Sequence, residues 1–337
     1  MSHPKQYTAY AFTEKGGKLQ KITVDWKDPQ QGEVVVKVLA CGVCGSDEFV
    51  ENVAIPSIKL PRIPGHEIIG EVVAIPSSEK LFKVGQRVGS GWHGGHCFTC
   101  NNCRRGIFNL CENEDINGIS RDGGYAEYAT LRSEALLPIP DDLNVAEAAP
   151  LLCAGVTTFN SLRHMDTQPG DIVAVQGIGG LGHLGIQFAS KMGFRTVALS
   201  SSPDKADLAK RLGATAYIDS SQTDQGKALQ EMGGAKVIMI TAQSGKAIEG
   251  LIDGLSLDGQ MLILGFPEAT PIWLPALIGK RASIRGWPSG SAKDSEETIE
   301  FAKFAGVKCM IQEFPLDKAQ EAYEHRGKAR FRAVIVP

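Results

Sequence analysis

The stretch IVAVQGIGGLGHLGIQFASKM, residues 172–192, decides the fold. Residues 172–175 are an apolar run of strand length, and a glycine-rich turn follows them. After the turn, apolar or small residues recur at positions 181, 184, 185, 188, 189 and 192, which is the spacing of one helix face. The stretch therefore predicts a strand, a tight turn and an amphipathic helix, the first half of a βαβ unit.

The glycine turn fits a dinucleotide-binding site. A G-x-G-x-x-G run between a strand and a helix permits a sharp turn, close approach of the backbone to a pyrophosphate, and close helix packing. The helix N-terminus favours the anion. The predicted pyrophosphate site is the turn formed by Gly177, Gly179, Gly180, Leu181 and Gly182.

The pattern of apolar residues differs between the two parts of the chain on either side of this unit. Further apolar runs at 196–199, 237–240 and 261–264 alternate with helix-like stretches, which predicts an α/β domain with a doubly wound parallel sheet. Residues 32–75 are instead rich in valine and isoleucine separated by turn residues, and they predict a β-rich domain. A helical stretch at 296–305 and a strand at 333–336 end the chain.

Length and composition set limits on the class of protein. The 337 residues suit two domains, and 43% hydrophobic with 22% charged residues is ordinary globular composition. A formal net charge of −3 disfavours a nucleic-acid or membrane-surface partner. The polar N-terminus and the strand-sized apolar runs predict a cytoplasmic protein without membrane spans. Its eight cysteines are then better read as metal ligands or buried thiols than as disulfides.

Four of the cysteines lie close together in the sequence. Cys97, Cys100, Cys103 and Cys111 have the spacing C-x2-C-x2-C-x7-C, which suits a tetrahedral zinc ion. Four thiolates close the coordination sphere, so this zinc would be structural. An iron–sulfur cluster is the main alternative, but ferredoxin runs place the fourth cysteine differently and follow it with proline, whereas Glu112 follows here. Four unrelated buried thiols are the other alternative.

A second group of possible ligands is dispersed along the chain. Cys44 in GVCGSD (residues 42–47) and His66 in GHE (residues 65–67) are ligand types for zinc, each beside a carboxylate that could support it. Cys153 in LLCAGVTTF is a candidate third ligand. Taken alone, each of these residues could equally be a packing side chain.

Taken together, GVCGSD, PGHE, the four-cysteine run, Cys153 and GIGGLG resemble the zinc-dependent medium-chain alcohol dehydrogenases over essentially the full chain. The branch most similar in appearance is that of the NADP-linked cinnamyl alcohol dehydrogenases and aldehyde reductases. The resemblance implies a β-rich GroES-like catalytic domain at 1–148 and 287–337, with a structural zinc lobe at 92–115, and a Rossmann domain at 149–286. It also implies an active site in the cleft between the domains and a homodimer or homotetramer.

The same resemblance assigns roles to individual residues. Cys44, His66 and Cys153 would hold a catalytic zinc, giving two zinc ions per chain, and the ion would act as a Lewis acid while a hydride passes between the cofactor and a primary alcohol or aldehyde. Asp47 would orient His66, Glu67 would support the site, and Ser46 would hydrogen-bond the substrate oxygen. The remaining implied positions are Thr157 and Trp287 beside the nicotinamide, Arg332 near the pyrophosphate, and Trp92 and His93 in the substrate pocket.

The end of the second strand bears on the choice of cofactor. NAD enzymes carry an acidic residue there to bind the ribose 2′-hydroxyl, but this chain has Ser200, Ser201, Ser202 and then Lys205. Hydroxyls and an ammonium accept a 2′-phosphate that a carboxylate would repel, so NADP(H) is predicted in preference to NAD(H). Serines that merely cap the next helix are the alternative.

Some residues depart from the family pattern. Phe49 stands where many relatives have a histidine that passes the proton to solvent, and Gly45 and Pro76 are also atypical. Cys41 and Cys309 are predicted to be packing thiols. The competing functions are an NAD-dependent alcohol or polyol dehydrogenase of the same superfamily, and a zinc-binding interaction or nucleic-acid module, which the acidic charge and the glycine turn disfavour.

Overall fold

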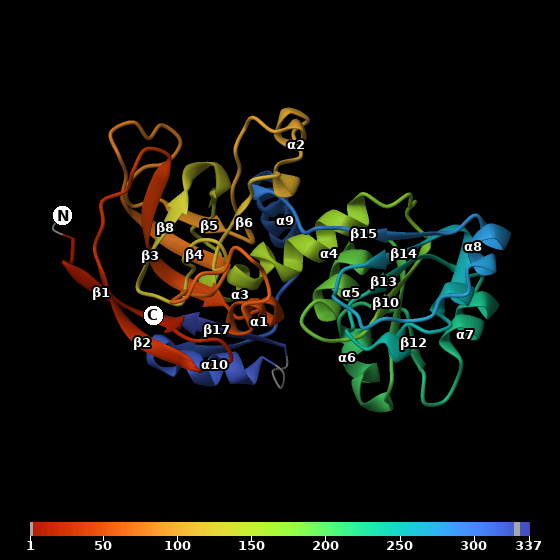
Figure 1. Cartoon of the computed structure of the whole chain (residues 1–337). Helices are drawn as coiled ribbons and strands as arrows, with labels where there is room; N and C mark the ends of the chain where they lie inside the picture. The colour runs from red at the N-terminus through yellow and green to blue at the C-terminus, as the bar shows by residue number, and fades with distance from the viewer. Residues whose placement is uncertain (1–2, 327–330) are drawn as a thin grey trace. The chain divides into compact units, whose positions relative to one another are not determined.

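The structure, a computed structural model, describes residues 3–326 and 331–337. The chain divides into two compact units (Figure 1). Unit 1 comprises Met1–Val156, Gly290–Lys303 and Lys308–Pro337, and unit 2 comprises Thr157–Ser289 and Phe304–Val307. One unit is β-rich and the other holds a parallel sheet, so the predicted fold class is confirmed.

Unit 1 is built on a seven-stranded sheet in the order β16-β17-β3-β4-β5-β9, with β8 also paired to β3. Its strands are β3 (Glu33–Gly42), β4 (Glu67–Ala74), β5 (Arg87–Ser90), β8 (Tyr128–Arg132), β9 (Leu137–Pro138), β16 (Ile311–Pro315) and β17 (Arg332–Val336). A separate antiparallel pair is formed by β1 (Gln6–Phe12) and β2 (Leu19–Asp25). Valines and isoleucines of β3 and β4 form much of the core, as the valine-rich segment predicted.

Short helices of unit 1 connect these strands. They are α1 (Glu48–Glu51), α3 (Val145–Ala148) and α10 (Ala319–His325). Two further helices, α4 (Ala154–Arg163) and α9 (Ala292–Ala305), each contain one of the points where the chain passes from one unit to the other. The predicted helical stretch at 296–305 thus begins four residues earlier, at Ala292.

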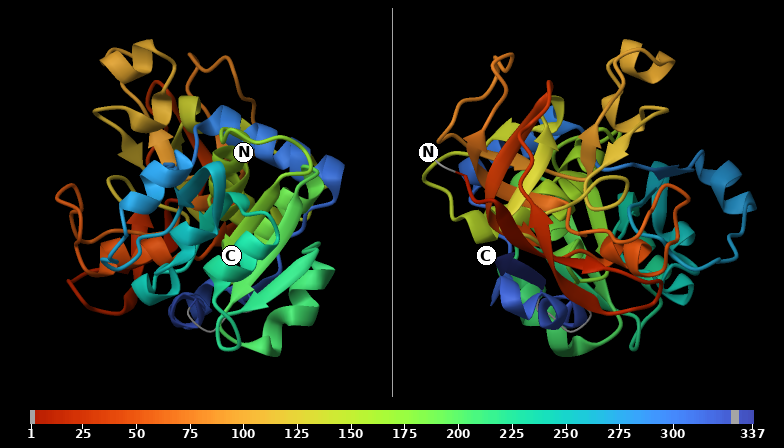
Figure 2. Two further views of the ribbon diagram at one scale, coloured as in Figure 1. Left: turned by 90° about the vertical axis from the view of Figure 1, so that its right-hand side faces the viewer. Right: turned by 60° about the vertical axis from the view of Figure 1, so that its left-hand side comes forward.

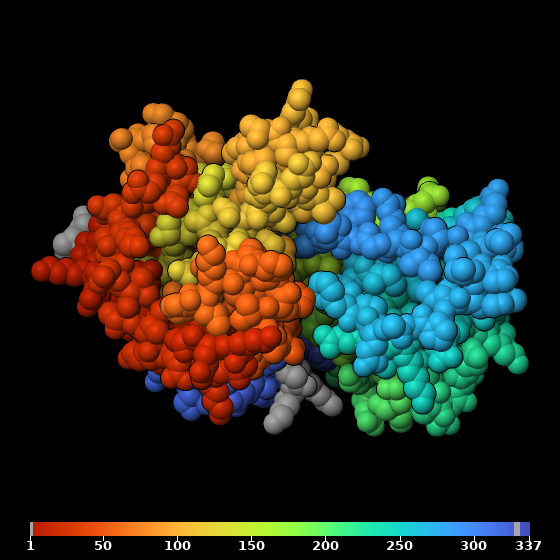
Figure 3. Space-filling view, viewed as in Figure 1, coloured from red at the N-terminus to blue at the C-terminus, as the bar shows by residue number. Residues whose placement is uncertain are grey.

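The four-cysteine segment forms a lobe that projects from the rest of unit 1 in both views of Figure 2 and as a knob in Figure 3. The lobe contains only α2 (Asn101–Arg104) and a short 3₁₀ turn at Phe108–Leu110. A two-stranded ladder of β6 (His93–Gly95) and β7 (Asp115–Ile116) closes its base. With so little regular structure, the lobe needs another source of order.

Unit 2 is a six-stranded parallel sheet in the order β12-β11-β10-β13-β14-β15. Its strands are β10 (Ile172–Gln176), β11 (Arg195–Ser200), β12 (Ala216–Asp219), β13 (Ala235–Ile240), β14 (Leu255–Ile263) and β15 (Ser283–Gly286). Its helices are α5 (Gly182–Lys191), α6 (Ala206–Arg211), α7 (Gln225–Glu231) and α8 (Pro275–Lys280). The strand order reverses between β10 and β13, which is where such sheets bind ligands.

Every residue of β10 is buried, so both faces of the sheet are covered at its centre. No helix among residues 3–326 and 331–337 combines the length and the apolar character needed to cross a membrane.

Candidate functional site

The three dispersed ligand candidates come together in unit 1. Cys44 follows the end of β3, and His66 immediately precedes β4. These strands are antiparallel neighbours, with Gly42 paired to Glu67, so the two side chains meet at one end of the ladder. Cys153 joins them after a 3₁₀ turn, and its sulfur lies 3.9 Å from that of Cys44. The ligand atoms of Cys44, His66, Glu67 and Cys153 all lie within 4.8 Å of one another.

The chemistry of this cluster fits a metal ion. His66 is fully buried, and in the part of the chain that the structure describes neither Nε2 nor Nδ1, which lies 3.2 Å from the Asp47 carboxylate, has a hydrogen-bond partner. Such an orphan nitrogen is costly to bury unless something binds it. The hydrogen bond between the two thiols lowers the pKa of Cys44 and, together with burial, raises that of Cys153. Two sulfurs and one imidazole nitrogen are a donor set that zinc favours.

Asp47 lies next to the imidazole of His66. One carboxylate oxygen lies 3.2 Å from His66 Nδ1. The carboxylate also accepts hydrogen bonds from the Cys44 N–H (2.9 Å) and the Tyr125 hydroxyl (2.7 Å). Asp47 is fully buried, so these contacts fix its position. Tyr125 is a supporting residue that the sequence analysis missed, because only the fold brings it to the site.

Glu67 and Arg332 form a buried ion pair at the cluster. Burial raises the pKa of Glu67 to about 7, and the guanidinium opposes that shift. The resemblance placed Arg332 near a pyrophosphate, whereas the structure shows its Nη2 atom bonded to the Glu67 carboxylate. The other carboxylate oxygen, Oε2, has no hydrogen-bond partner within the described residues. Glu67 therefore adds an available oxygen donor beside the two sulfurs and the imidazole.

The two predicted pocket residues, Trp92 and His93, separate in the structure. The Trp92 ring meets the His66 ring edge to face at 5.0 Å and lies 6.5 Å from Phe49, so it borders the cluster. Ser46 lies half-buried on the short turn after Cys44. His93 turns elsewhere, because its two ring nitrogens contact Glu114 at 2.8 Å and His96 at 3.0 Å. Its buried position ties the base of the lobe together.

The four-cysteine cluster also forms as its spacing predicted. The sulfurs of Cys97, Cys100, Cys103 and Cys111 lie within 4.8 Å of one another. Backbone N–H groups point at three of these sulfurs at 3.3 to 3.4 Å, among them Cys100 N–H to Cys97 and Cys103 N–H to Cys100. The Thr99 hydroxyl is the main cause that lowers the pKa of Cys97, to about 5. Hydrogen bonds from backbone N–H groups also lower the pKa of Cys100, whereas burial raises the pKa of Cys103, to about 12, and that of Cys111.

The glycines in the turn of unit 2 differ in backbone conformation and in what surrounds them. Gly177 has a φ of +88°, which favours glycine. A Cβ on Gly182 would lie 1.8 Å from the Gly177 carbonyl oxygen, so a side chain there is excluded. A Cβ on Gly179 would meet nothing within 4 Å, which leaves space for a ligand. Gly180 and Leu181 complete the turn, and α5 begins at Gly182.

The serine loop follows β11 and contacts the glycine turn. The Lys205 ammonium donates to the Ile178 carbonyl at 3.1 Å, which joins the two segments. The Ser202 hydroxyl lies 3.3 Å from the Asp204 carboxylate. Asp219 is an acidic residue that the sequence analysis missed, because it ends β12, a strand with a weak apolar pattern. It is in register with Ser200 on the adjacent strand, so it lies close to the start of the loop.

The two residues predicted beside the nicotinamide both lie in unit 2. Thr157 is buried on α4, and Trp287 directly follows β15. The Trp287 ring stacks on His164 at 4.6 Å, and its indole nitrogen is buried without a hydrogen-bond partner in the described residues. Contact with a cofactor stays a prediction for both residues.

The thiols predicted to serve packing are both buried, Cys41 completely and Cys309 at 4% exposure. Burial is the main cause that raises the pKa of each. Neither belongs to a cysteine cluster among the described residues.

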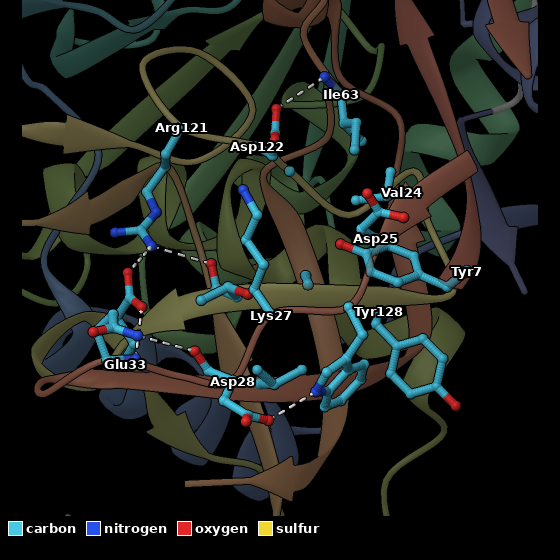
Figure 4. A pocket seen from close by; sticks show the side chains of 16 residues that line it. Tyr7, Val24, Asp25, Lys27, Asp28, Glu33, Ile63, Arg121, Asp122 and Tyr128 are labelled. Atoms are coloured by element: carbon cyan, nitrogen blue, oxygen red, sulfur yellow. Dashed lines mark hydrogen bonds and ion pairs between the residues drawn. The ribbon is translucent and has the colours of Figure 1, made fainter. Parts of the chain in front are cut away.

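A cavity of about 300 Å³ opens elsewhere in unit 1, between the end of β2 and the segment before β8 (Figure 4). None of the predicted site residues lines it. Most of its charged groups have partners within the protein, such as Asp28 with Trp26 and Glu33 with Arg121. The cavity is therefore separate from both cysteine clusters.

Comparisons with known proteins agree with this geometry. The family model of the alcohol dehydrogenase GroES-like domain matches residues 30–141, and that of the zinc-binding dehydrogenases matches residues 180–304. Alcohol dehydrogenase patD of Penicillium expansum is 49% identical over 98% of both chains. A probable cinnamyl alcohol dehydrogenase of Pinus radiata is 34% identical over 98% of this chain and 96% of its own. The solved cinnamyl alcohol dehydrogenase of Sorghum bicolor superposes with a TM-score of 0.90, at 31% identity over 98% of both chains.

Proposed function

This chain belongs to the zinc-binding alcohol dehydrogenase family, and on that premise we propose that it transfers a hydride between NADP(H) and a primary alcohol or aldehyde. The observation that carries the proposal is that the sulfurs of Cys44 and Cys153 lie beside the imidazole of His66. The Nε2 atom of this imidazole has no hydrogen-bond partner within the described residues. The proposal includes two zinc ions per chain, one in each cysteine cluster, and small alcohols and aldehydes as substrates.

A zinc ion held by Cys44, His66 and Cys153 would polarise the substrate oxygen as a Lewis acid. Asp47 holds the imidazole in one orientation, and its own contacts fix it in turn. The Ser46 hydroxyl would hydrogen-bond the substrate oxygen and relay its proton, taking the alcohol hydrogen as its own passes to water, with the reverse transfer when an aldehyde is reduced. Trp92 covers one side of the site and limits the size of the substrate.

The residues of unit 2 bind the cofactor, which supplies the hydride chemistry. The backbone of the glycine turn and the start of α5 bind the pyrophosphate, because their N–H groups favour an anion. Thr157 and Trp287 contact the nicotinamide end. Arg332 is proposed to contact the pyrophosphate while its Nη2 atom stays bonded to the Glu67 carboxylate.

The preference for NADP rests on the serine loop. Ser200, Ser201, Ser202 and Lys205 supply hydrogen-bond donors for a 2′-phosphate. One hydrogen bond to a charged group contributes about 1.5 to 3 kcal/mol, which is roughly tenfold or more in affinity. NAD is the second candidate, because Asp219 lies in register with Ser200 and its carboxylate could bind a ribose hydroxyl.

An assay of primary aldehydes with NADPH and NADH in parallel tests the reaction and the cofactor together. We expect kcat/KM with NADPH to exceed that with NADH by about tenfold or more. Lys205→Ala should lower the NADPH value about tenfold and leave the NADH value within about twofold, while the exposed Lys210→Ala serves as a matched control. Stronger turnover with NADH would favour the second candidate, and no turnover with any aldehyde would overturn the proposed reaction.

We also propose that the protein is a homodimer that forms through unit 2. Strand β15 is an edge of the parallel sheet and is exposed along its whole length. Exposed edges and apolar residues invite association, and unit 2 also exposes Trp273 (68%) and Ile278 (83%). Sedimentation should show a dimer, a tetramer would require a further interface, and a monomer would contradict the proposal. The free cysteines of both clusters suit the cytoplasm, where we expect the protein to act.

A further inference from the structure

The segment that leaves the four-cysteine lobe carries a buried asparagine, Asn117, that the site described above does not use. Asn117 directly follows β7 and is fully buried. Its backbone N–H donates to the Trp92 carbonyl at 3.2 Å. Its side-chain Nδ2 donates to the Ser90 hydroxyl at 2.8 Å and to the Gly91 carbonyl at 2.9 Å. One residue therefore holds three consecutive residues of the segment that leads to Trp92.

The held segment has little room to move in other directions. The Ser90 hydroxyl, which accepts a hydrogen bond from Asn117, itself donates to the Ala135 carbonyl at 3.0 Å. A Cβ on Gly91 would lie 2.3 Å from the carbonyl oxygen of Leu152, the residue before Cys153. Gly91 therefore packs against the backbone of Leu152, next to Cys153, and its own carbonyl accepts a hydrogen bond from Asn117.

The residue after Asn117 is packed against the second ligand candidate. Gly118 has a φ of +73°, and a Cβ there would lie 2.8 Å from the Gly65 N atom, one residue before His66. Asn117 therefore lies between two segments. The residue after it packs against Gly65, next to His66, and its carboxamide is bonded to the segment that leads to Trp92. Trp92 in turn meets the His66 ring at 5.0 Å.

We propose that Asn117 is a positioning residue that fixes Trp92 beside His66 and thereby sets the size of substrate that the site accepts. This inference rests on the proposed function for its meaning, because Trp92 limits substrate size only if the cluster is the reaction centre. A carboxamide NH₂ group suits the task, since its two hydrogens meet two acceptors, the Ser90 hydroxyl oxygen and the Gly91 carbonyl oxygen. Serine could supply one such hydrogen and alanine none.

Steady-state kinetics with primary alcohols of increasing size test the inference. The proteins compared are the unaltered enzyme, Asn117→Ala, Trp92→Ala and the double variant. We expect Asn117→Ala to raise kcat/KM for bulky relative to small alcohols by about tenfold, the scale of one methylene group in a pocket. Trp92→Ala should do the same, and the double variant should not exceed Trp92→Ala, because both changes remove one restriction. Asn101→Ala, on the exposed surface of the same lobe, should keep the original size profile.

A second readout does not depend on activity. Acrylamide quenching of Trp92 is obtained as the difference between each protein and its Trp92→Phe counterpart, which removes the signal of the other tryptophans. We expect Asn117→Ala to make Trp92 about twofold or more accessible, while Asn101→Ala leaves it unchanged. If the alanine variant does not fold, Asn117→Ser takes its place and should show the same two changes to a smaller extent.

The outcomes separate the two proposals. If Asn117 variants slow all alcohols by one common factor and leave Trp92 quenching unchanged, Asn117 serves only general stability and the inference is wrong. If the unaltered protein turns over no alcohol or aldehyde, the proposed function fails, and quenching alone decides whether Asn117 positions Trp92.

Discussion

The two cysteine clusters of unit 1 are made in opposite ways. The lobe collects Cys97, Cys100, Cys103 and Cys111 from one short segment, whereas the other cluster unites Cys44, His66 and Cys153 from three separate parts of the chain. Ligands that are close in sequence lose little entropy when they converge, and distant ligands converge only because a folded sheet brings them together. On the proposed assignment of one zinc ion to each cluster, the lobe would depend on the metal for order, while the second cluster depends on the fold.

The surroundings of the clusters fit this difference. In the lobe, Phe98 and Leu110 are 57% and 48% exposed, so little apolar burial holds it together. Around the second cluster, His66, Glu67 and Asp47 are completely buried, and hydrogen bonds hold the carboxylates of Asp47 and Glu67. Loss of metal should therefore lower stability at the lobe and abolish chemistry at the second cluster.

The largest effect is expected for Cys44→Ser. Replacing one sulfur of the second cluster should lower kcat about ten-thousand-fold, or about 5.4 kcal/mol, because substrate polarisation is lost. Zinc content should fall from about two to about one per chain, since the lobe keeps its ion. Cys309→Ser, a buried cysteine outside both clusters, is the matched control and should keep its activity within about threefold. Full activity in Cys44→Ser would remove the distinction between the clusters.

Cys103→Ser should reverse the pattern. We expect the free energy of unfolding to fall by about 4 kcal/mol and Tm to fall by about 10 °C, because a structural metal stabilises its site directly. Activity of the folded variant at 20 °C should stay within about threefold, since the other cluster is intact. Thermal melts and initial rates on one sample check both numbers. An unchanged Tm would show that the lobe is held by something other than metal.

A smaller effect is expected from the buried Glu67–Arg332 ion pair at the second cluster. Glu67→Gln leaves Arg332 buried without its charge partner, and breaking such a pair costs about 3 kcal/mol or more of unfolding free energy. Glu67→Gln with Arg332→Gln should cost less than the sum of the single changes, which denaturant unfolding would measure. If the losses of unfolding free energy in the two single variants added up to that of the double variant, the interaction between Glu67 and Arg332 would contribute nothing to stability.

The smallest effect lies outside both clusters and gives a baseline. Burial tends to raise the pKa of Glu79, but hydrogen bonds from the Ser133 hydroxyl and three backbone N–H groups outweigh it and lower the pKa. A lowered carboxyl pKa stabilises the fold above the ordinary value, and this stability is lost as pH falls through the folded-state value. Glu79→Gln should thus cost about 1 kcal/mol at pH 7, reduced by solvent screening, and less at pH 3. A cost that stays equal at both pH values would exclude this ionic origin.

Local patterns predicted the centre of unit 2 well and its edges poorly. Strand β10 and helix α5 follow the predicted ranges closely, because both are buried and strongly apolar. The sequence analysis missed β12 and β15, which are the two edge strands of the sheet and lack an apolar run. Asp219 was overlooked for the same reason.

The same limit applies to the site. Spacing alone identified the four-cysteine cluster, but Cys153 could be selected only through resemblance, since its own surroundings read as core. The contact of Arg332 with Glu67 and the turn of His93 toward Glu114 depend on long-range packing. No local pattern predicts the contacts of Tyr125 or Asn117, because each hydrogen-bonds to residues more than twenty positions away in the sequence.

The central claim is that the dispersed residues Cys44, His66 and Cys153 share one metal ion. X-ray diffraction from crystals of the metal-loaded protein, recorded on both sides of the zinc absorption edge, tests it directly. We predict two anomalous peaks per chain, one among the four lobe sulfurs and one bonded to Cys44, His66 and Cys153 at about 2.0 to 2.3 Å. A single peak confined to the lobe, with those three side chains apart, would contradict the account.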